Sequence, residues 1–120
     1  MSSTAPRVYV VDRIVAKPGQ ADAFAKAYRE RYVAGAQARG MRLELSLLSP
    51  PVLLAEQSNT LLYVWSVEGA GGYWAMCFQG RQDPALQDWW WREAAVLIES
   101  RERLVASDLA DVAALGAMPC

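Results

Sequence analysis

The sequence predicts a ferredoxin-like α+β fold, in which one four-stranded antiparallel sheet is built from elements in the order βαββααβ. Segments rich in β-branched and aromatic residues alternate with segments of helical periodicity, and neither a repeat nor a linker separates them. The 120 residues suit one domain, because typical domains have about 100–150 residues. We therefore expect one domain over residues 1–106 and a C-terminal tail over residues 107–120.

A strand and a helix are expected first. Val8–Val15 is β-branched and aromatic, which is typical of a strand, and Pro18-Gly19 interrupts it. Residues Gln20–Arg39 then predict a helix that stops at Gly40, a residue that takes the left-handed conformation easily. Three aromatic residues recur at every fourth position of this helix and therefore share one face: Phe24, Tyr28 and Tyr32.

Two more strands are expected after this helix. Met41–Leu47 alternates strictly between apolar and polar residues, which predicts a strand with one apolar face. Val52–Gln57 is expected to continue it as an irregular edge strand. Leu61–Val67 is apolar almost throughout, so we expect a central strand that is covered on both faces. Gly69–Gly72 is expected to be a flexible junction.

The last third of the domain is expected to hold two helices and the fourth strand. Tyr73–Gln79 predicts a short helix. Asp83 is a suitable N-cap, and Pro84 fits the first helical position, where a missing amide donor costs nothing. This second helix is expected to run to about Ser100, and Arg101–Ala106 then forms the fourth strand.

Composition argues against several classes of function. The chain has no His, which excludes Ser-His-Asp and Cys-His catalytic pairs, imidazole-ligated haem and His-based zinc sites. Its 12 basic and 13 acidic residues leave a formal charge of −1, unlike a surface that coats nucleic acid. No apolar run is long enough for a membrane span, and the first residues lack a signal-peptide pattern. Cys77 and Cys120 do not make a disulfide framework, so we expect a cytoplasmic protein. Because the chain has no His, we also expect no bound metal or organic cofactor.

Short motifs along roughly residues 7–106 carry a family resemblance. They are Tyr9 with Pro18-Gly19 after it, Val64-Trp65-Ser66 in the third strand, Asp83-Pro84 and Trp89-Trp90-Trp91 in the last helix, and Arg101-Glu102-Arg103-Leu104 after that helix. With these motifs the chain resembles the dimeric α/β-barrel superfamily. Within it, the chain looks most like the NIPSNAP-like and antibiotic-biosynthesis-monooxygenase-like proteins.

The resemblance implies an architecture and a range of activities. Two sheets would pair face to face in a homodimer, and each subunit would hold a small-molecule pocket between sheet and helices. The superfamily includes cofactor-independent monooxygenases, lactone isomerases and cyclases, besides many proteins without a known reaction. The absence of His argues against its haem-binding branches. One position departs from the pattern, because the family often has Arg in the first strand where this chain has Asp12, and the neighbouring Arg13 faces the other side.

The candidate site residues are polar and aromatic side chains. Asp12 in an apolar pocket would serve as general acid or base, with Arg42 and Tyr63 polarising the substrate. The alternative role of Asp12 is an ion pair that stabilises the sheet or the dimer. Five aromatic residues are expected to line the same cavity or, alternatively, to belong to an ordinary core: Tyr9, Trp65, Tyr73, Trp74 and Trp90.

Two further features leave alternatives open. The three consecutive Trp residues 89–91 cover most of a helix circumference, so one enters the core and the others meet a dimer partner or line a ligand pocket. Arg101 and Arg103 share one face of a strand, where they either hold a ligand carboxylate or enolate or lie at a solvated strand end.

Two classes of function are compatible with these observations. The first is a cofactor-independent enzyme that acts on a small apolar or aromatic metabolite by proton transfer, as an isomerase, cyclase or lyase, or by oxygenation. The second is a non-catalytic, dimeric ligand-binding module of the NIPSNAP-like kind. A cavity in which Asp12 or Glu44 converges on Tyr or Arg side chains favours the enzyme, whereas a dry aromatic cavity favours the binding module.

Overall fold

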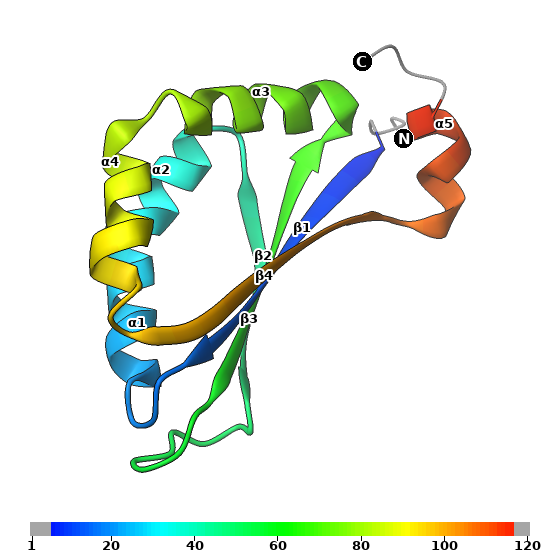
Figure 1. Ribbon diagram of the computed structural model, residues 1–120. Coiled ribbons are helices and arrows are strands. Elements are labelled where there is room, and N and C mark those ends of the chain that lie inside the picture. Colours follow the sequence, from blue (N-terminus) through cyan, green and yellow to red (C-terminus); the bar gives the residue numbers. More distant parts are fainter. Residues whose placement is uncertain (1–5, 117–120) are drawn as a thin grey trace.

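A four-stranded antiparallel sheet forms the centre of the protein (Figure 1). The computed structural model describes residues 6–116. The strands are β1 (Arg7–Ala16), β2 (Arg42–Ser49), β3 (Thr60–Glu68) and β4 (Ile98–Ser107). Their order in the sheet is β2-β3-β1-β4, so β1 and β3 are central and β4 is an edge strand. This confirms the predicted α+β class and the four-stranded antiparallel sheet.

The helices that precede β4 lie on one side of the sheet, whereas the last helix lies past the end of β4, away from this layer (Figure 1). α1 (Ala21–Ala27), the π-helical turn η1 (Tyr28–Tyr32) and α2 (Val33–Ala38) form one continuous helical segment after β1. α3 (Gly69–Arg81), α4 (Pro84–Asp88) and the π-helical turn η2 (Trp89–Ala94) connect β3 to β4. Beyond β4, the 3-10 turn η3 (Leu109–Asp111) and α5 (Val112–Gly116) end the described chain, and Cys120 lies outside it.

Three predicted elements were wrong. Gly69–Gly72 is no flexible junction, because it is the first turn of α3, where tertiary packing overrides the low helix propensity of Gly. Val52–Gln57 is no strand and contains only bends and irregular backbone. The second helix does not reach Ser100, since the helical segment ends at Ala94 and β4 already begins at Ile98. The pairing of Ile98 with the end of β1 fixes this early start of the strand.

The two faces of the sheet differ sharply in burial. One face of β1 lies under the helices, and its residues Val8, Val10, Asp12 and Ile14 are buried. The register places Tyr63 of β3 and Arg103 of β4 directly beside Asp12, so these three side chains share the helix-covered face.

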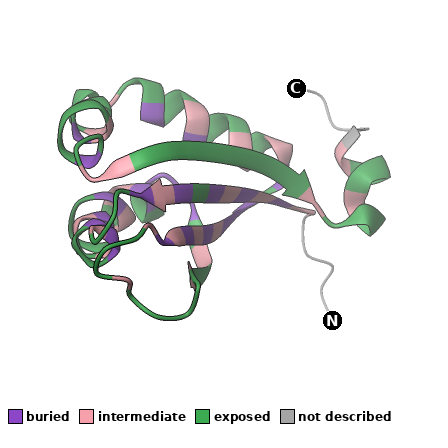
Figure 2. Cartoon of the chain, turned by 60° about the horizontal axis from the view of Figure 1, so that its bottom comes forward, coloured by how far each residue is buried: buried purple, intermediate pink, exposed green. Residues whose placement is uncertain are grey.

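The opposite face of the sheet is covered by none of the described elements. Leu45 and Leu47 of β2 and Leu104 of β4 retain 52%, 47% and 67% exposure. Leu62 and Val64 of β3 are half-buried there, so within one chain the central strand is fully covered on one face only. Figure 2 shows this contrast along the strands, with β4 exposed over most of its length.

Aromatic side chains dominate the core between sheet and helices. As predicted, Phe24, Tyr28 and Tyr32 share the inner face of their helical segment, and all three are buried. The Tyr28 ring stacks on Tyr63 at 3.8 Å between centroids, and the Tyr32 ring stacks on Trp89 at 5.8 Å. The two halves of the helical layer therefore meet through aromatic rings above β1 and β3.

Candidate functional site

A cavity of about 740 Å³ lies between α3, α4, η2 and strand β4. Its volume falls in the range of small-molecule sites, which is about 300–1,000 Å³. Its wall combines apolar groups, four arginines and one carboxylate: Met76, Leu86, Trp90, Trp91 and Ile98; Arg39, Arg81, Arg101 and Arg103; and Glu99, together with Tyr32 and Cys77. The cavity therefore offers an apolar surface and an excess of positive charge.

A buried ion pair supports the floor of this cavity. Asp12 is fully buried, and Arg103 donates to both of its oxygens, from Nε to Oδ1 at 2.7 Å and from Nη2 to Oδ2 at 3.0 Å. The same Nη2 donates to the Tyr32 hydroxyl at 3.0 Å. Asp12 itself does not line the cavity, whereas Arg103 and Tyr32 do. Asp12 thus fixes the position of an arginine that the cavity exposes.

A chain of hydrogen bonds extends from Asp12 into the core. The Tyr28 hydroxyl donates to Asp12 Oδ2 at 3.3 Å and accepts a hydrogen bond from Trp65 Nε1 at 2.7 Å. Burial, followed by the charge of Asp12, raises the pKa of Tyr28 far above its ordinary value. Tyr28 therefore stays neutral and keeps its proton for Asp12.

Arg101 lies next to this network and faces the cavity. Its guanidinium stands over the Trp90 ring at 3.7 Å from the centroid, which is the geometry of a cation–π contact. Its Nη2 is 3.9 Å from Asp12 Oδ1, so it shares the carboxylate with Arg103 only weakly. The side chains of Arg101 and Arg103 remain 31% and 29% exposed, which leaves donors available to a ligand.

The electrostatics of the two arginines differ. Burial by itself would lower the pKa of Arg103, but hydrogen bonds and charge from Asp12 outweigh it and raise this pKa. Burial lowers the pKa of Arg101, because the attraction of Asp12 does not offset it and the charge of Arg103 adds to it. One carboxylate therefore neutralises one guanidinium, and the second guanidinium lacks a full partner.

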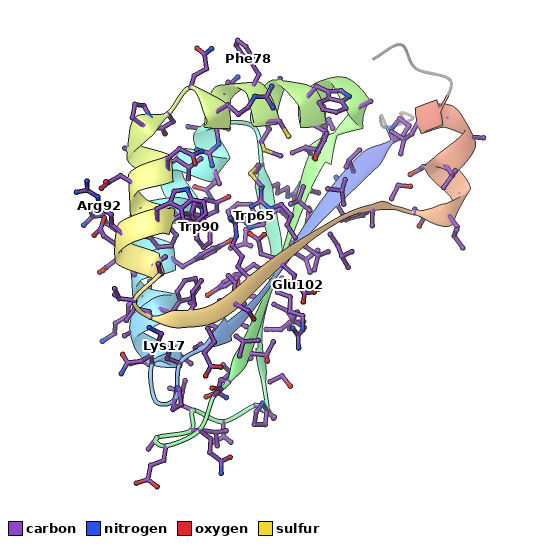
Figure 3. The ribbon with its side chains drawn as sticks, in the orientation of Figure 1. Lys17, Trp65, Phe78, Trp90, Arg92 and Glu102 are labelled. Carbon is purple, nitrogen blue, oxygen red and sulfur yellow. The ribbon has the colours of Figure 1, made fainter. Side chains whose placement is uncertain are left out.

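Besides Asp12, three of the predicted site residues lie on the helix-covered side near this network. Trp90 lines the cavity, and Figure 3 shows it on the side of η2 that faces the sheet, whereas Arg92 points away. Trp65 is fully buried beneath the network. Tyr63 is buried beside Asp12 in the register, and burial raises its pKa to about 12.

The other predicted site residues lie elsewhere. Tyr9 and Arg42 belong to the uncovered face of the sheet, and Arg42 Nε is 3.6 Å from Glu44 Oε2 there. Tyr73 in α3 is half-buried, and its hydrogen bond with Cys77, ahead of burial, raises its pKa. Trp74, the next residue of α3, is 51% exposed. The structure therefore does not bring Arg42 to Asp12, nor Tyr9 to the other aromatic residues, because the sheet separates them.

Sequence reasoning missed or undervalued the basic residues of the cavity. Arg101 and Arg103 were expected either at a ligand or at a solvated strand end, and only the register of β4 against β1 shows that they meet Asp12. Arg39 was not singled out, and Tyr32 was predicted only as part of the aromatic face of its helix, because the sequence does not show what that helix packs against. Of the three consecutive Trp residues, Trp89 lies in the core and Trp90 on the cavity wall, whereas Trp91 lies at the edge of the cavity and is 77% exposed.

Within residues 6–116, no three or more Cys, Asp and Glu side chains gather as they would around a metal ion. In the same residues no helix combines the length and apolar character of a bilayer span.

No protein-family model and no curated protein sequence matches the chain. Solved structures do match. A NIPSNAP family protein from Agrobacterium tumefaciens superposes with a TM-score of 0.70 at 16% identity, over 90% of each chain. An uncharacterised NIPSNAP domain protein from Burkholderia xenovorans gives 0.68 at 16% identity, over 86% of this chain and 95% of that one.

An antibiotic biosynthesis monooxygenase-like protein from Nitrosomonas europaea gives a TM-score of 0.60 at 14% identity, over 91% of this chain and 96% of that one. Neighbours of both kinds were predicted from the sequence motifs, and this prediction is confirmed at the level of the fold. At such low identity the likeness shows the fold alone, so the function has to be argued from the cavity.

Proposed function

We propose that the protein binds a small, largely apolar or aromatic metabolite that carries a negatively charged oxygen, in the cavity between the helices and β4. One observation carries the proposal: Arg101 lies on Trp90 at 3.7 Å beside an arginine that Asp12 holds in place, at the wall of a cavity of about 740 Å³. The Trp90 ring supplies the apolar contact, and the guanidinium groups supply donors for a carboxylate or enolate.

The binding test compares two probes of the same shape, naphthoate and the uncharged naphthamide. We expect naphthoate to bind at least about tenfold more tightly, because hydrogen bonds between charged groups contribute about 1.5–3 kcal/mol. Arg101→Met should abolish this preference. The matched control is Arg92→Met, which changes an exposed arginine of η2, the turn that carries Trp90, and this arginine points away from the cavity. Equal affinity for both probes, or equal losses in both variants, would refute the proposal.

A catalytic role is the second candidate, and the network around Asp12 favours it. Arg103 and Tyr32 are held rigidly at the cavity wall, as donors must be to stabilise an oxyanion that forms during proton transfer. Glu99 is the only carboxylate among the described lining residues, and it is the candidate base. In this scheme Asp12 positions Arg103 instead of transferring a proton.

Phenylpyruvate tests this scheme, because it is aromatic, carries a carboxylate and has an acidic methylene group. Glu99 would take one methylene proton, the enolate oxygen would receive donors from Arg103 and Tyr32, and solvent would return a deuteron to the carbon. We expect the protein to accelerate deuterium exchange, and Arg103→Met to remove most of this rate. Oxygenation of an electron-rich ring would use the same oxyanion stabilisation and is tested by oxygen uptake with a quinol. Binding without either reaction would leave the non-catalytic module as the function.

We also propose that a second copy of the chain covers the open face of the sheet. That face exposes apolar side chains, among them Leu45, Leu47 and Leu104, to an extent that is unusual for a monomer. Pairing of two such faces about a twofold axis is the simplest way to bury them. Sedimentation at micromolar concentration tests this directly, and a monomer under these conditions would contradict it.

A further inference from the structure

Arg39, which follows α2, carries a buried charge with little to balance it. Its side chain is only 7% exposed, and its Nε has no hydrogen-bond partner among the described residues. Within residues 6–116, the only carboxylate within 4.0 Å of this guanidinium is Asp83, whose Oδ2 is 4.0 Å from Arg39 Nη1. Asp83 uses its other oxygen to cap α4, where it accepts from the amide of Ala85 at 3.0 Å. Since guanidinium remains charged at all ordinary pH values, this side chain needs an anion.

The surroundings of Arg39 hold it against the cavity described above. The guanidinium carbon lies 5.7 Å from the centre of the Tyr32 ring. On another side is Gly80, where an added Cβ would lie 3.8 Å from Arg39 Nε. Both Gly80 and Arg39 line the cavity. Gly80 and Arg39 therefore lie side by side at the cavity wall.

Tyr32 connects this second cationic group to the first. Arg39 lies over its ring, and Arg103 donates to its hydroxyl at 3.0 Å. The two guanidinium groups thus contact different parts of the same tyrosine side chain. A small molecule that lies along the cavity wall would reach both, with Trp90 beside Arg101 against its apolar body.

We propose that Arg39 is the second anion anchor of the cavity, and that the natural ligand is a small aromatic or apolar molecule with two acidic groups. One group binds at Arg101 and Arg103, and the other binds the guanidinium group of Arg39. This inference rests on the proposed binding function and narrows its ligand class from a monoanion to a dianion. It also explains why the cavity wall holds four arginines and one carboxylate among its described residues.

Terephthalate and monomethyl terephthalate provide a matched pair of probes, because they share one shape and differ by one negative charge. We expect the protein to bind terephthalate at least about tenfold more tightly than the monoester. Arg39→Met should reduce the affinity for terephthalate to that for the monoester and leave monoester binding unchanged. Arg39→Lys should keep part of the preference, because it retains the charge but lacks the planar guanidinium group. Arg92→Met is again the exposed control.

Thermal unfolding without ligand shows whether Arg39→Met folds. We expect its Tm to equal or exceed that of the parent protein, since the substitution removes a buried charge that lacks a partner. If the parent binds both probes equally, or if Arg39→Met keeps the tenfold preference, the second anchor is overturned while the binding function stands. If the parent binds neither probe at millimolar concentration, both the binding function and the second anchor are overturned.

Discussion

Asp12→Asn is the most direct test of the buried network, because it removes one charge and almost no volume. Asp12 accepts from Arg103 through both oxygens and from the Tyr28 hydroxyl. An asparagine amide offers a single acceptor oxygen to these three donor contacts, and its NH₂ group faces another donor. Tyr28 cannot turn its hydrogen elsewhere without a penalty, since its oxygen already accepts from Trp65. The variant therefore leaves a charge and at least one donor unsatisfied in the core.

The expected loss in the free energy of unfolding follows from the burial of Asp12 and Arg103. Removing one member of a buried ion pair typically costs about 3–5 kcal/mol. Asp12 is fully buried, but the Arg103 side chain keeps 29% exposure, so water compensates part of the loss. We expect Asp12→Asn to lower the free energy of unfolding by about 2–4 kcal/mol. Because domains of this size are stable by about 5–15 kcal/mol, the variant should still fold.

Urea unfolding followed by Trp fluorescence measures this loss. Asp88→Asn is the matched control, since it makes the same substitution in an exposed i, i+4 pair on the helices, where Arg92 Nε lies 3.0 Å from Asp88 Oδ1, and it should cost less than about 1 kcal/mol. The double variant Asp12→Asn with Arg103→Met should be more stable than the sum of the single losses predicts, because no charge is then left alone. Strict additivity, or a loss no larger than in the control, would refute the reasoning.

Three further predictions address the fold. Gly19→Ala should lower the free energy of unfolding by at least about 2 kcal/mol, because φ is +75° and the new Cβ would lie 2.5 Å from the Ala55 carbonyl oxygen. Gly71→Ala is its counterpart: this position of α3 faces open space, so the variant should raise the free energy of unfolding by about 0.5–1 kcal/mol in the same urea assay. Burial raises the pKa of Tyr63 from 10.0 to about 12 in the folded protein. Its contribution to the free energy of unfolding is therefore fully present below pH 10 and is lost as the pH rises to 12. Between pH 10 and 12 the urea midpoint should fall less steeply with pH for Tyr63→Phe than for the parent protein. Equal slopes of midpoint against pH would contradict burial of the Tyr63 hydroxyl. Leu104→Glu should shift the proposed dimer to monomer in sedimentation without altering the circular dichroism spectrum, and an unchanged mass would argue against the open face as the interface.

The parts of the fold that were predictable are those that local patterns determine. The i, i+4 spacing of the aromatic residues at 24, 28 and 32 survives in the structure, because one-sided burial produces it. The alternation in Met41–Leu47 correctly predicted a strand, but the single apolar face was wrong, because the bulge after Leu43 turns Leu45 and Leu47 to the open face. The glycines at 69–72 misled the prediction, since their weak helix propensity is outweighed by docking of α3. The start of β4 depends on pairing with β1, which a single segment does not encode.

The site was less predictable than the fold, because it depends on pairing between distant segments. Asp12 was identified from its position in an apolar strand, but its partner Arg103 lies 91 residues away along the chain. Choosing Arg42 as the partner required the two to share a face, and the sheet places them on opposite faces. The bulge between Leu43 and Leu45 further changes which residues of β2 face the helices. Register and bulges must therefore be known before charged residues can be paired.

The two π-helical turns explain how the helical layer presents these side chains to the network and the cavity. η1 contains Tyr28 and Tyr32, and η2 contains Trp89 and Trp90. A π turn inserts an additional residue into the helix and so rotates the residues that follow relative to those before it. In η2 this places adjacent tryptophans differently, with Trp89 packed on Tyr32 in the core and Trp90 beneath the guanidinium of Arg101. Such irregular turns occur frequently at functional sites, and here both of them meet at the same wall. Helix propensity does not reveal these turns, and so the sequence does not show that Tyr32, Trp90 and Trp91 meet α3 and β4 at one cavity wall.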